Sequence, residues 1–377
     1  MKKFEIVFVS LPFSSARGGA ENAILKLAQF FESRKSRVAL FTASKILRNI
    51  FRENKISARK IWFEKINPVS RISLLFFPIF APALILIAFF LTAFCKIRGA
   101  RKIFLHHFQE KIFFSFFAQL FHLEIFCVEH ELFRDSILRN PLFGIFKFAT
   151  RNATFLTPSQ FLKTEILKNL PRAKIEVLPN FVDDFKSMNN GFKPIVAPQN
   201  THKNFIVGFC GRFAAEKNIS EILQIAAILR DEKVEFHLAG TGELFAKIKN
   251  EIATQNLKNV FLRGFLGKKN LKKFYKKIDA FVLFSKFETF GIAVAENCAA
   301  GNPAFLADIP PFREIADENC AEFFDEKNRA KKVAARILFL RENPQILQKM
   351  KNAARTNFER KFTREKVEKI AARLFQI

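Results

Sequence analysis

The sequence predicts an α/β protein of two Rossmann-like domains, each built on a parallel sheet. Short apolar runs, typical of buried strands, alternate with amphipathic helical patterns along nearly the whole chain. The alternation stops at residues 189–203, where Pro, Asn and Gly gather, and then restarts. The 377 residues suffice for two domains of roughly 100 to 200 residues each.

Each half supplies a series of expected strands. In the first half they are Phe4–Val9, Arg37–Phe41, Lys102–Leu105, Glu124–Val128, Thr154–Thr157 and Lys174–Leu178. In the second half they are Phe205–Cys210, Val234–Ala239, Asn259–Leu262, Ala280–Phe284 and Pro303–Leu306. Helices fill the intervals, as at Glu21–Glu32, where apolar residues recur at helical spacing directly after Gly18 and Gly19. From about Lys327 the chain is charged and helical, with an interruption at Pro344.

The composition narrows the function class. Hydrophobic residues make up 49% of the chain, which excludes a disordered protein. Lys and Arg number 62 against 35 Asp and Glu, a net charge of +27, so we expect polyanionic partners such as nucleotides, nucleic acid or anionic lipid. The five cysteines form no CxxC pair, which indicates reduced packing residues in a cytoplasmic protein.

One apolar segment suggests contact with a membrane. Ile72–Cys95 contains 24 residues without a charge and is followed by a basic cluster that begins at Lys96. Its length is enough to span a bilayer, but Pro78 and Pro82 are expected to break its first half. We therefore expect it to dock on an anionic membrane surface. An internal core helix and a true span are the alternatives.

The glycines are scarce and occur mainly at expected strand ends. Ten of the 13 fall there: Gly18, Gly19, Gly208, Gly211, Gly240, Gly242, Gly264, Gly267, Gly291 and Gly301. Glycine permits a positive φ or the close approach of backbone to a phosphate, although ordinary turn chemistry is the alternative at each position. Their joint placement favours a phosphorylated ligand between two domains.

Two loops of the second half carry candidate ligand-binding side chains. In Gly211–Asn218, Arg212 and Lys217 can meet both phosphates of a diphosphate. In Phe287–Pro303, the two acids Glu288 and Glu296 flank a helix start at Gly291. We expect the first amides of that helix to receive a diphosphate, Glu296 to bind ribose hydroxyls and Glu288 to bind a sugar. The alternative makes Glu288 a helix cap and Glu296 a solvated helix residue.

Together these motifs resemble the retaining nucleotide-sugar glycosyltransferases of family 4, which have the GT-B fold. The resemblance rests on the Glu288/Glu296 pair, the Arg212/Lys217 loop and the GGAEN run that begins at Gly18. It implies two doubly wound domains facing across a cleft. Residues 1–188 would bind the acceptor, 189–203 would be a linker, 204–356 would bind the donor, and 357–377 would cross back to the first domain.

The resemblance also implies roles for individual residues. The donor site would comprise Gly18, Gly19, Arg212, Lys217, Gly264, Phe265, Glu288, Phe290, Gly291, Ile292, Ala293 and Glu296. The catalytic residues would be His130, Glu288, Arg212 and Lys217. His130 would lie near the transferred sugar; without the resemblance, a core or capping histidine is the favoured interpretation.

The implied function is transfer of a sugar, with retention, from a UDP- or GDP-linked donor to a lipid-linked or cell-envelope acceptor. The donor is a substrate, and no cofactor is expected. The chain has no D-x-D triplet to hold a metal, so we expect metal independence. The expected location is the inner face of the plasma membrane. A sugar-nucleotide epimerase or phosphorylase of the same fold, and a basic nucleic-acid-binding protein, are the alternatives.

Overall fold

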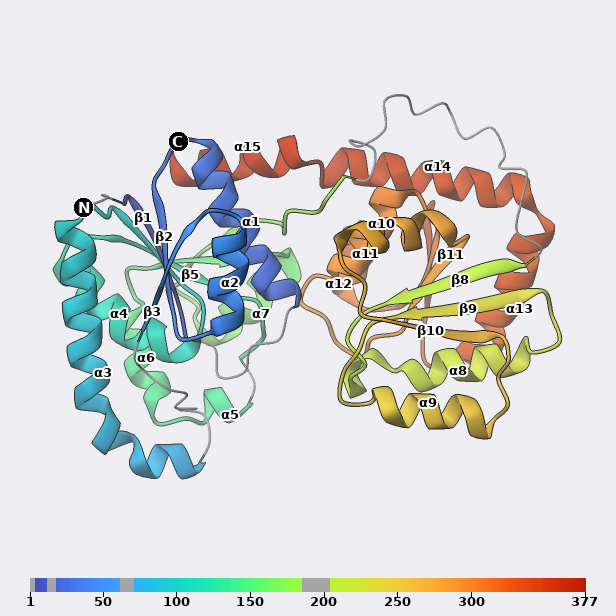
Figure 1. Ribbon diagram of the computed structural model, residues 1–377, viewed down its shortest axis with the longest axis horizontal. Coiled ribbons are helices and arrows are strands. Elements are labelled where there is room, and N and C mark those ends of the chain that lie inside the picture. The colour runs from blue at the N-terminus through green and yellow to red at the C-terminus, as the bar shows by residue number, and fades with distance from the viewer. Residues whose placement is uncertain (1–3, 12–17, 62–70, 134, 185–203) are drawn as a thin grey trace. The chain divides into compact units, whose positions relative to one another are not determined.

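The computed structural model describes residues 4–11, 18–61, 71–133, 135–184 and 204–377, with the side chains of 71–76 left aside (Figure 1). The chain divides into two compact units. Unit 1 comprises Met1–Phe181 together with Glu368–Ile377, and unit 2 comprises Val182–Val367. The predicted linker, residues 189–203, lies outside the described residues.

Unit 1 is built on a seven-stranded sheet of order β3-β2-β1-β4-β5-β6-β7, in which every pairing is parallel. The strands are β1 Ile6–Ser10, β2 Val38–Thr42, β3 Ser57–Lys60, β4 Lys102–Leu105, β5 Glu124–Val128, β6 Thr154–Thr157 and β7 Lys174–Val177. The helices are α1 Gly19–Ser33, α2 Lys45–Glu53, α3 Arg71–Ile97, α4 Phe108–Leu120, α5 Asp135–Leu138, α6 Leu142–Ala149 and α7 Gln160–Asn169. The six strands expected here are present to within two residues.

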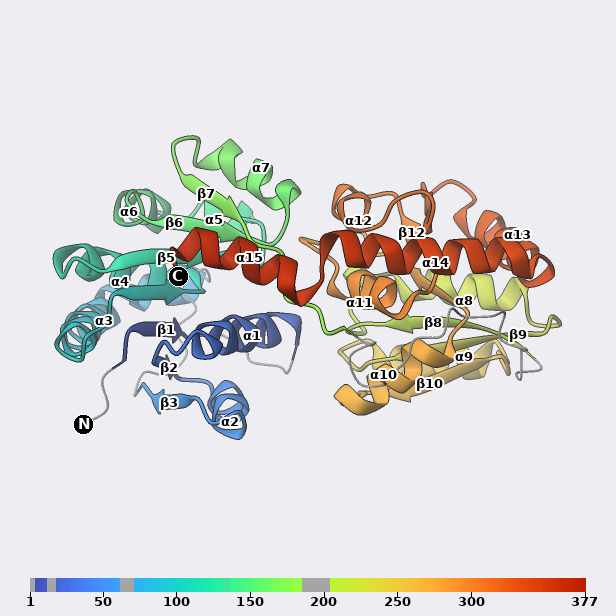
Figure 2. The ribbon, with the colours of Figure 1, turned by 90° about the horizontal axis from the view of Figure 1, so that it is seen from above.

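Helices cover both faces of this sheet. On one face, α3, α4 and α6 share a core with strand residues such as Val9 and Leu105. On the other face, Phe8 and Phe104 stack at 4.8 Å between ring centroids, and Phe31 of α1 packs on both. The last helix, α15 (Arg364–Phe375), ends on this second face beside α1, where the ring of Phe375 lies 4.9 Å from that of Phe31 (Figure 2). The end of the chain is thus part of the core of unit 1.

Helix α3 differs from the expectation at its prolines. Pro78 and Pro82 lie inside one continuous helix of 27 residues. A proline within a helix removes one backbone hydrogen bond and crowds the preceding turn, so it bends the helix without always ending it. Figure 1 shows such a bend in the first half of α3. Among the described residues, Phe77–Ile97 is the stretch long and apolar enough, by length and composition, to cross a membrane.

Unit 2 is built on a six-stranded parallel sheet of order β10-β9-β8-β11-β12-β13. The strands are β8 Phe205–Cys210, β9 Val234–Ala239, β10 Val260–Gly264, β11 Ala280–Leu283, β12 Ala304–Ala307 and β13 Ala321–Phe324. The helices are α8 Ile219–Ile228, α9 Phe245–Thr254, α10 Lys268–Lys277, α11 Ile292–Ala300, α12 Pro310–Ile315, α13 Arg329–Glu342 and α14 Pro344–Lys361. The five expected strands are again present. Pro344 separates α13 from α14 and opens the second, where its missing N–H costs nothing.

Candidate active site

In unit 2, the two loops that carry the predicted cations and acids are joined to each other. Lys217 lies in a short 3₁₀ turn before α8, and its Nζ contacts Glu288 Oε1 at 2.5 Å. The Lys286 amide donates to the Glu216 carbonyl at 2.8 Å, and the Ser285 hydroxyl donates to the same Glu288 oxygen at 3.1 Å. Because β8 and β11 are adjacent and parallel, their carboxyl ends bring these loops together.

The start of α11 has the geometry of an anion site. Gly291 caps this nine-residue helix with φ of 103°, and a Cβ there would lie 2.9 Å from the ring of Phe312. Glycine is therefore required at this position. The first amides of a helix have no acceptor within it, so those of Ile292 and Ala293 stand at its open end. Helix N-termini of this kind attract phosphate groups.

Glu296, further along α11, has a polar partner inside unit 2. The hydroxyl of Tyr275, on α10, donates to Glu296 Oε2 at 3.2 Å and lies 3.3 Å from the Ala293 carbonyl oxygen. Tyr275 is fully buried, and burial raises the pKa of its phenol well above the usual range. The phenol therefore remains a donor at physiological pH. The alternative of a merely solvated Glu296 does not fit this bond.

The other predicted donor-site residues of unit 2 differ in exposure: some lie at the surface, and one is buried in the core. Arg212 is exposed and pairs with Glu216 at 2.8 Å. Gly264 ends β10 with φ of 62°, and the ring of Phe265 beside it is exposed. Phe290 instead packs its ring into the core against Phe362, with 5.7 Å between centroids, so its side chain serves packing.

One predicted glycine has a plainly structural reason. Gly240 follows β9 with φ of 133°, and a Cβ there would lie 1.8 Å from the carbonyl oxygen of Gly211. The loops after β8 and β9 thus pack backbone against backbone, which only glycine allows. At this position the glycine is explained by a structural turn and close backbone packing, and no phosphate is needed to explain it.

In unit 1, His130 lies at the carboxyl end of β5. Its ring stacks on that of His106, with centroids 6.1 Å apart. Both line a cavity of about 30 Å³, large enough to hold a water, together with Glu129 and Thr157 from neighbouring strand ends. Burial and the nearby Lys111 lower the pKa of His130 to about 4, so its imidazole is neutral at pH 7. Gly18 and Gly19 begin α1 in this unit, where the Gly18 amide donates to the Glu21 carboxylate at 3.1 Å.

A cluster of buried ionisable side chains lies near His130. Lys111, on α4, pairs with Glu129 at 2.8 Å and donates to the Val128 carbonyl at 2.8 Å. Glu110 accepts from the amides of Leu11, His106 and His107, at 3.0, 3.1 and 2.8 Å. Sequence reasoning missed this cluster. The feature that could have revealed it is the adjacent pair Glu110 and Lys111 within the otherwise mostly apolar helix α4.

Sequence reasoning also missed Tyr275 and Ser285. The signal for Tyr275 was that it is the single tyrosine in a chain with 51 phenylalanines. Across the described residues, no group of three or more His, Cys, Asp or Glu side chains has the arrangement of a metal site.

Two family models together match most of the chain. The model described as glycosyltransferase family 4 matches residues 17–184, and the model described as glycosyl transferases group 1 matches residues 194–357. The chain belongs to glycosyltransferase family 4. The family predicted from the paired acids and the basic loop is therefore confirmed.

Curated relatives of this glycosyltransferase match over part of their length. An uncharacterised glycosyltransferase of Methanocaldococcus jannaschii is 26% identical over 233 residues, which cover 61% of this chain and 62% of the relative. The GDP-mannose:cellobiosyl-diphosphopolyprenol alpha-mannosyltransferase of Xanthomonas campestris is 31% identical over 152 residues, covering 39% of this chain and 38% of the relative. The chain spans less than two thirds of the length of either.

A solved structure matches over nearly the full length. Anabaena HepE, crystallised with UDP and glucose, has a TM-score of 0.76 and 14% sequence identity, and the match covers 99% of each chain. The likeness concerns the fold, and it confirms the predicted GT-B class.

Proposed function

We propose that this family 4 glycosyltransferase transfers a sugar, with retention, from a UDP- or GDP-linked donor to a membrane-associated acceptor. The observation that carries the proposal is the junction of the β8 and β11 loops, where Lys217 contacts Glu288 next to the open N-terminus of α11. A cation and free helix amides at one edge of a parallel sheet match the needs of a diphosphate. UDP, which is bound in the crystal structure of Anabaena HepE, supports the same donor class.

Different residues of unit 2 would bind different parts of the donor. Arg212 and Lys217 would face the diphosphate with the amides of Ile292 and Ala293, and Glu296, held by Tyr275, would accept hydrogen bonds from the ribose. Gly264 and Phe265 would lie beside the base. Glu288 would bind sugar hydroxyls.

The chemical step needs no protein nucleophile. The bond between the anomeric carbon and the leaving phosphate oxygen breaks, while the acceptor oxygen bonds that carbon on the same face. The leaving diphosphate takes the acceptor proton, so charge and atoms balance. The protein would contribute positioning and stabilisation of the departing diphosphate, without a metal, through Lys217 and the α11 N-terminus.

A membrane-associated acceptor would explain the apolar segment Ile72–Cys95 and the net charge of +27. The name of the Xanthomonas relative, which acts on a diphosphopolyprenol-linked acceptor, supports a lipid-linked or envelope substrate. The enzyme would then work peripherally on the inner face of the plasma membrane.

A panel of UDP- and GDP-sugars, screened by thermal shift, tests the donor site, because a ligand that binds the folded state raises its Tm. We expect one donor class to raise the Tm of the full chain and Glu296→Gln to abolish the shift. Glu318→Gln, at an exposed carboxylate, is the matched control and should retain it. If no nucleotide sugar shifts the Tm, the donor proposal is wrong.

The reaction type needs a second measurement. With donor alone, a transferase leaves the sugar unchanged or releases it slowly, whereas an epimerase converts it. The anomeric configuration of a transfer product, read by NMR, then tests retention.

A further inference from the structure

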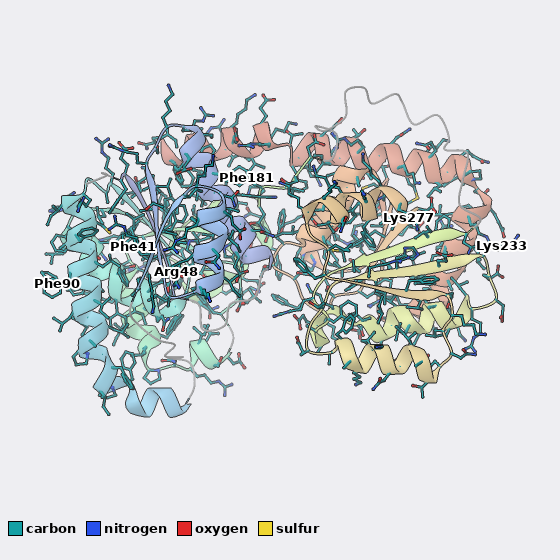
Figure 3. The ribbon with its side chains drawn as sticks, viewed as in Figure 1. Phe41, Arg48, Phe90, Phe181, Lys233 and Lys277 are labelled. Carbon is teal, nitrogen blue, oxygen red and sulfur yellow. The ribbon has the colours of Figure 1, made fainter. Side chains whose placement is uncertain are left out.

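Exposed apolar side chains gather on three helices of unit 1. Of the 15 large hydrophobic residues exposed in the described part of the chain, ten lie on α3, α4 and α6. They are Ile79, Phe80, Ile85, Leu86, Phe90 and Ile97 on α3, Phe116 and Leu120 on α4, and Ile145 and Phe148 on α6. Phe90 is 64% exposed and points away from the sheet (Figure 3).

These residues form one surface, because the three helices pack side by side. The ring of Phe89, next to Phe90, lies 5.5 Å from that of Phe117, next to Phe116. Gln119, next to Leu120, donates to the backbone carbonyl of Ala149, next to Phe148, at 2.6 Å. We call the exposed side of α3, α4 and α6 the three-helix face.

The charges of the three-helix face are of one sign. Within the described side chains of these helices the one acid is Glu110, which is fully buried. The exposed cations stand at or just beyond the helix ends: Lys96 in the last turn of α3, Arg101 directly before β4, Lys147 in the last turn of α6, and Arg151 two residues after it. Arg151 lies 4.0 Å from the ring centroid of Phe148, so a cation and an apolar ring occupy the same edge.

The inner side of α3 determines how such a face would meet a bilayer. Leu84, Ala88 and Cys95 form a buried stripe in the core of unit 1. A helix that spanned the membrane would have to leave this core and expose the stripe and the sheet beneath it. Contact from the side, with the helix lying along the interface, keeps the core intact.

We propose that the three-helix face is a docking surface for the anionic leaflet of a lipid bilayer. Its rings and aliphatic side chains would enter the boundary of the acyl chains, while Lys147 and Arg151 meet lipid phosphates. A second copy of the chain is a poorer occupant, because it would set like charges against each other. The proposal rests on the membrane-associated acceptor of the proposed function, and it adds α4 and α6 to the segment that the sequence suggests.

Flotation with vesicles of phosphatidylglycerol and phosphatidylcholine tests the docking surface with the full chain. Phe116→Ser and Phe148→Ser lie outside α3, and each should weaken binding about tenfold, in keeping with the loss of one buried aromatic side chain. Ile228→Ser, at a 49% exposed site in unit 2, is the matched control and should bind as the parent does. Vesicles of phosphatidylcholine alone should bind all four proteins more weakly.

The outcomes separate this proposal from the proposed function. If Phe116→Ser and Phe148→Ser bind vesicles as the parent does, the three-helix face is not the docking surface. If these variants instead convert a dimer to a monomer in gel filtration, a second copy occupies the face and the proposal is overturned. Nucleotide-sugar thermal shifts are measured without vesicles, so their failure would overturn the donor assignment while leaving the docking result standing.

Discussion

The hydroxyl of Tyr275 on α10 lies 3.2 Å from Glu296 Oε2 on α11, and this phenol is the single tyrosine of the chain. The ring is fully buried against Phe274 and Phe281, where a phenylalanine would pack as well. Packing therefore does not explain the tyrosine, and its hydroxyl group does. It holds one oxygen of Glu296 and, in the proposed donor site, would orient the other toward the ribose, as a positioning residue does.

Tyr275→Phe should raise the KM for the nucleotide sugar about tenfold with a smaller effect on kcat, because a hydrogen bond to a charged group contributes roughly 1.5 to 3 kcal/mol. If Glu296 binds the ribose, the parent enzyme should discriminate against donors with a 3′-deoxyribose, and the variant should discriminate less. Initial rates with matched donors measure both effects.

The control for Tyr275→Phe is the double variant that also carries Glu296→Gln. Two residues that act as one unit give non-additive effects, so Tyr275→Phe combined with Glu296→Gln should lose little more than Glu296→Gln alone. Additive losses would mean that Tyr275 supports the fold and not the carboxylate.

Glu288→Gln should tighten the binding of nucleoside diphosphate and slow the transfer of sugar. Lys217 and Glu288 neutralise each other at 2.5 Å, and both side chains are mostly buried. Without the negative charge, the Lys217 ammonium can pair with the diphosphate, while the sugar hydroxyls lose a charged acceptor and keep only the weaker amide oxygen. Calorimetric titration with UDP and GDP checks the affinity, and Glu318→Gln serves again as the exposed control. Weaker diphosphate binding in Glu288→Gln would contradict this account.

The sequence predicts the fold well where strands are apolar and poorly where they are not. Val7, Val9 and Phe8 alternate between two buried faces, and so their strand is plain in the pattern. The edge strand β3, Ser57–Lys60, has one buried residue, Ala58, and no apolar run to reveal it. The strand β13, Ala321–Phe324, was missed as well, and it too lies at the edge of its sheet.

The candidate site, too, has a part that the sequence predicts and a part that it does not. Lys217 and Glu288 could be assigned to one site from the sequence because both follow strands whose ends meet in a parallel sheet, but their ion pair was not predicted. The Tyr275–Glu296 bond joins two helices across 21 positions of sequence, and no short motif encodes such a contact. Phe290 stands within the motif, yet its side chain turns inward, since neighbours in sequence need not share a face.

At pH 9, where Glu110 is ionised although burial raises its pKa to about 8, Glu110→Gln should destabilise the protein by about 1 to 3 kcal/mol, the cost of one buried amide left without an acceptor. The carboxyl oxygens of Glu110 accept from the amides of Leu11, His106 and His107. A glutamine offers one oxygen, so its NH₂ must face at least one of these donors. Urea unfolding followed by circular dichroism measures the change, with the exposed Glu124→Gln as the control. Equal stability of Glu110→Gln and the parent would show that the three amides find other acceptors.

Stability should fall as the pH is lowered from about 6.5 to about 4, and His130 should carry part of that fall. Burial, followed by repulsion from Lys111, lowers the pKa of His130 from 6.5 to about 4. Between these values the unfolded chain binds a proton that the folded chain does not, so the stability from this group is complete above pH 6.5 and is lost on acidification. One proton corresponds to about 1.4 kcal/mol per pH unit at most.

His130→Gln isolates this contribution, since it removes the titrating ring and leaves the other groups in place. Glu110 acts in the opposite direction, because burial raises its pKa to about 8 in the folded state, and the lowered pKa of His107, about 3, adds to the acid loss. Both remain in the variant, so the difference between its unfolding free energy and that of the parent contains the titration of His130 together with the repulsion that His130 exerts on His107. The difference should therefore change with pH between 6.5 and 4, in urea titrations at each half unit, and stay constant above pH 7. A difference that is flat throughout would mean that His130 is protonated alike in the folded and unfolded chain, and that burial does not lower its pKa.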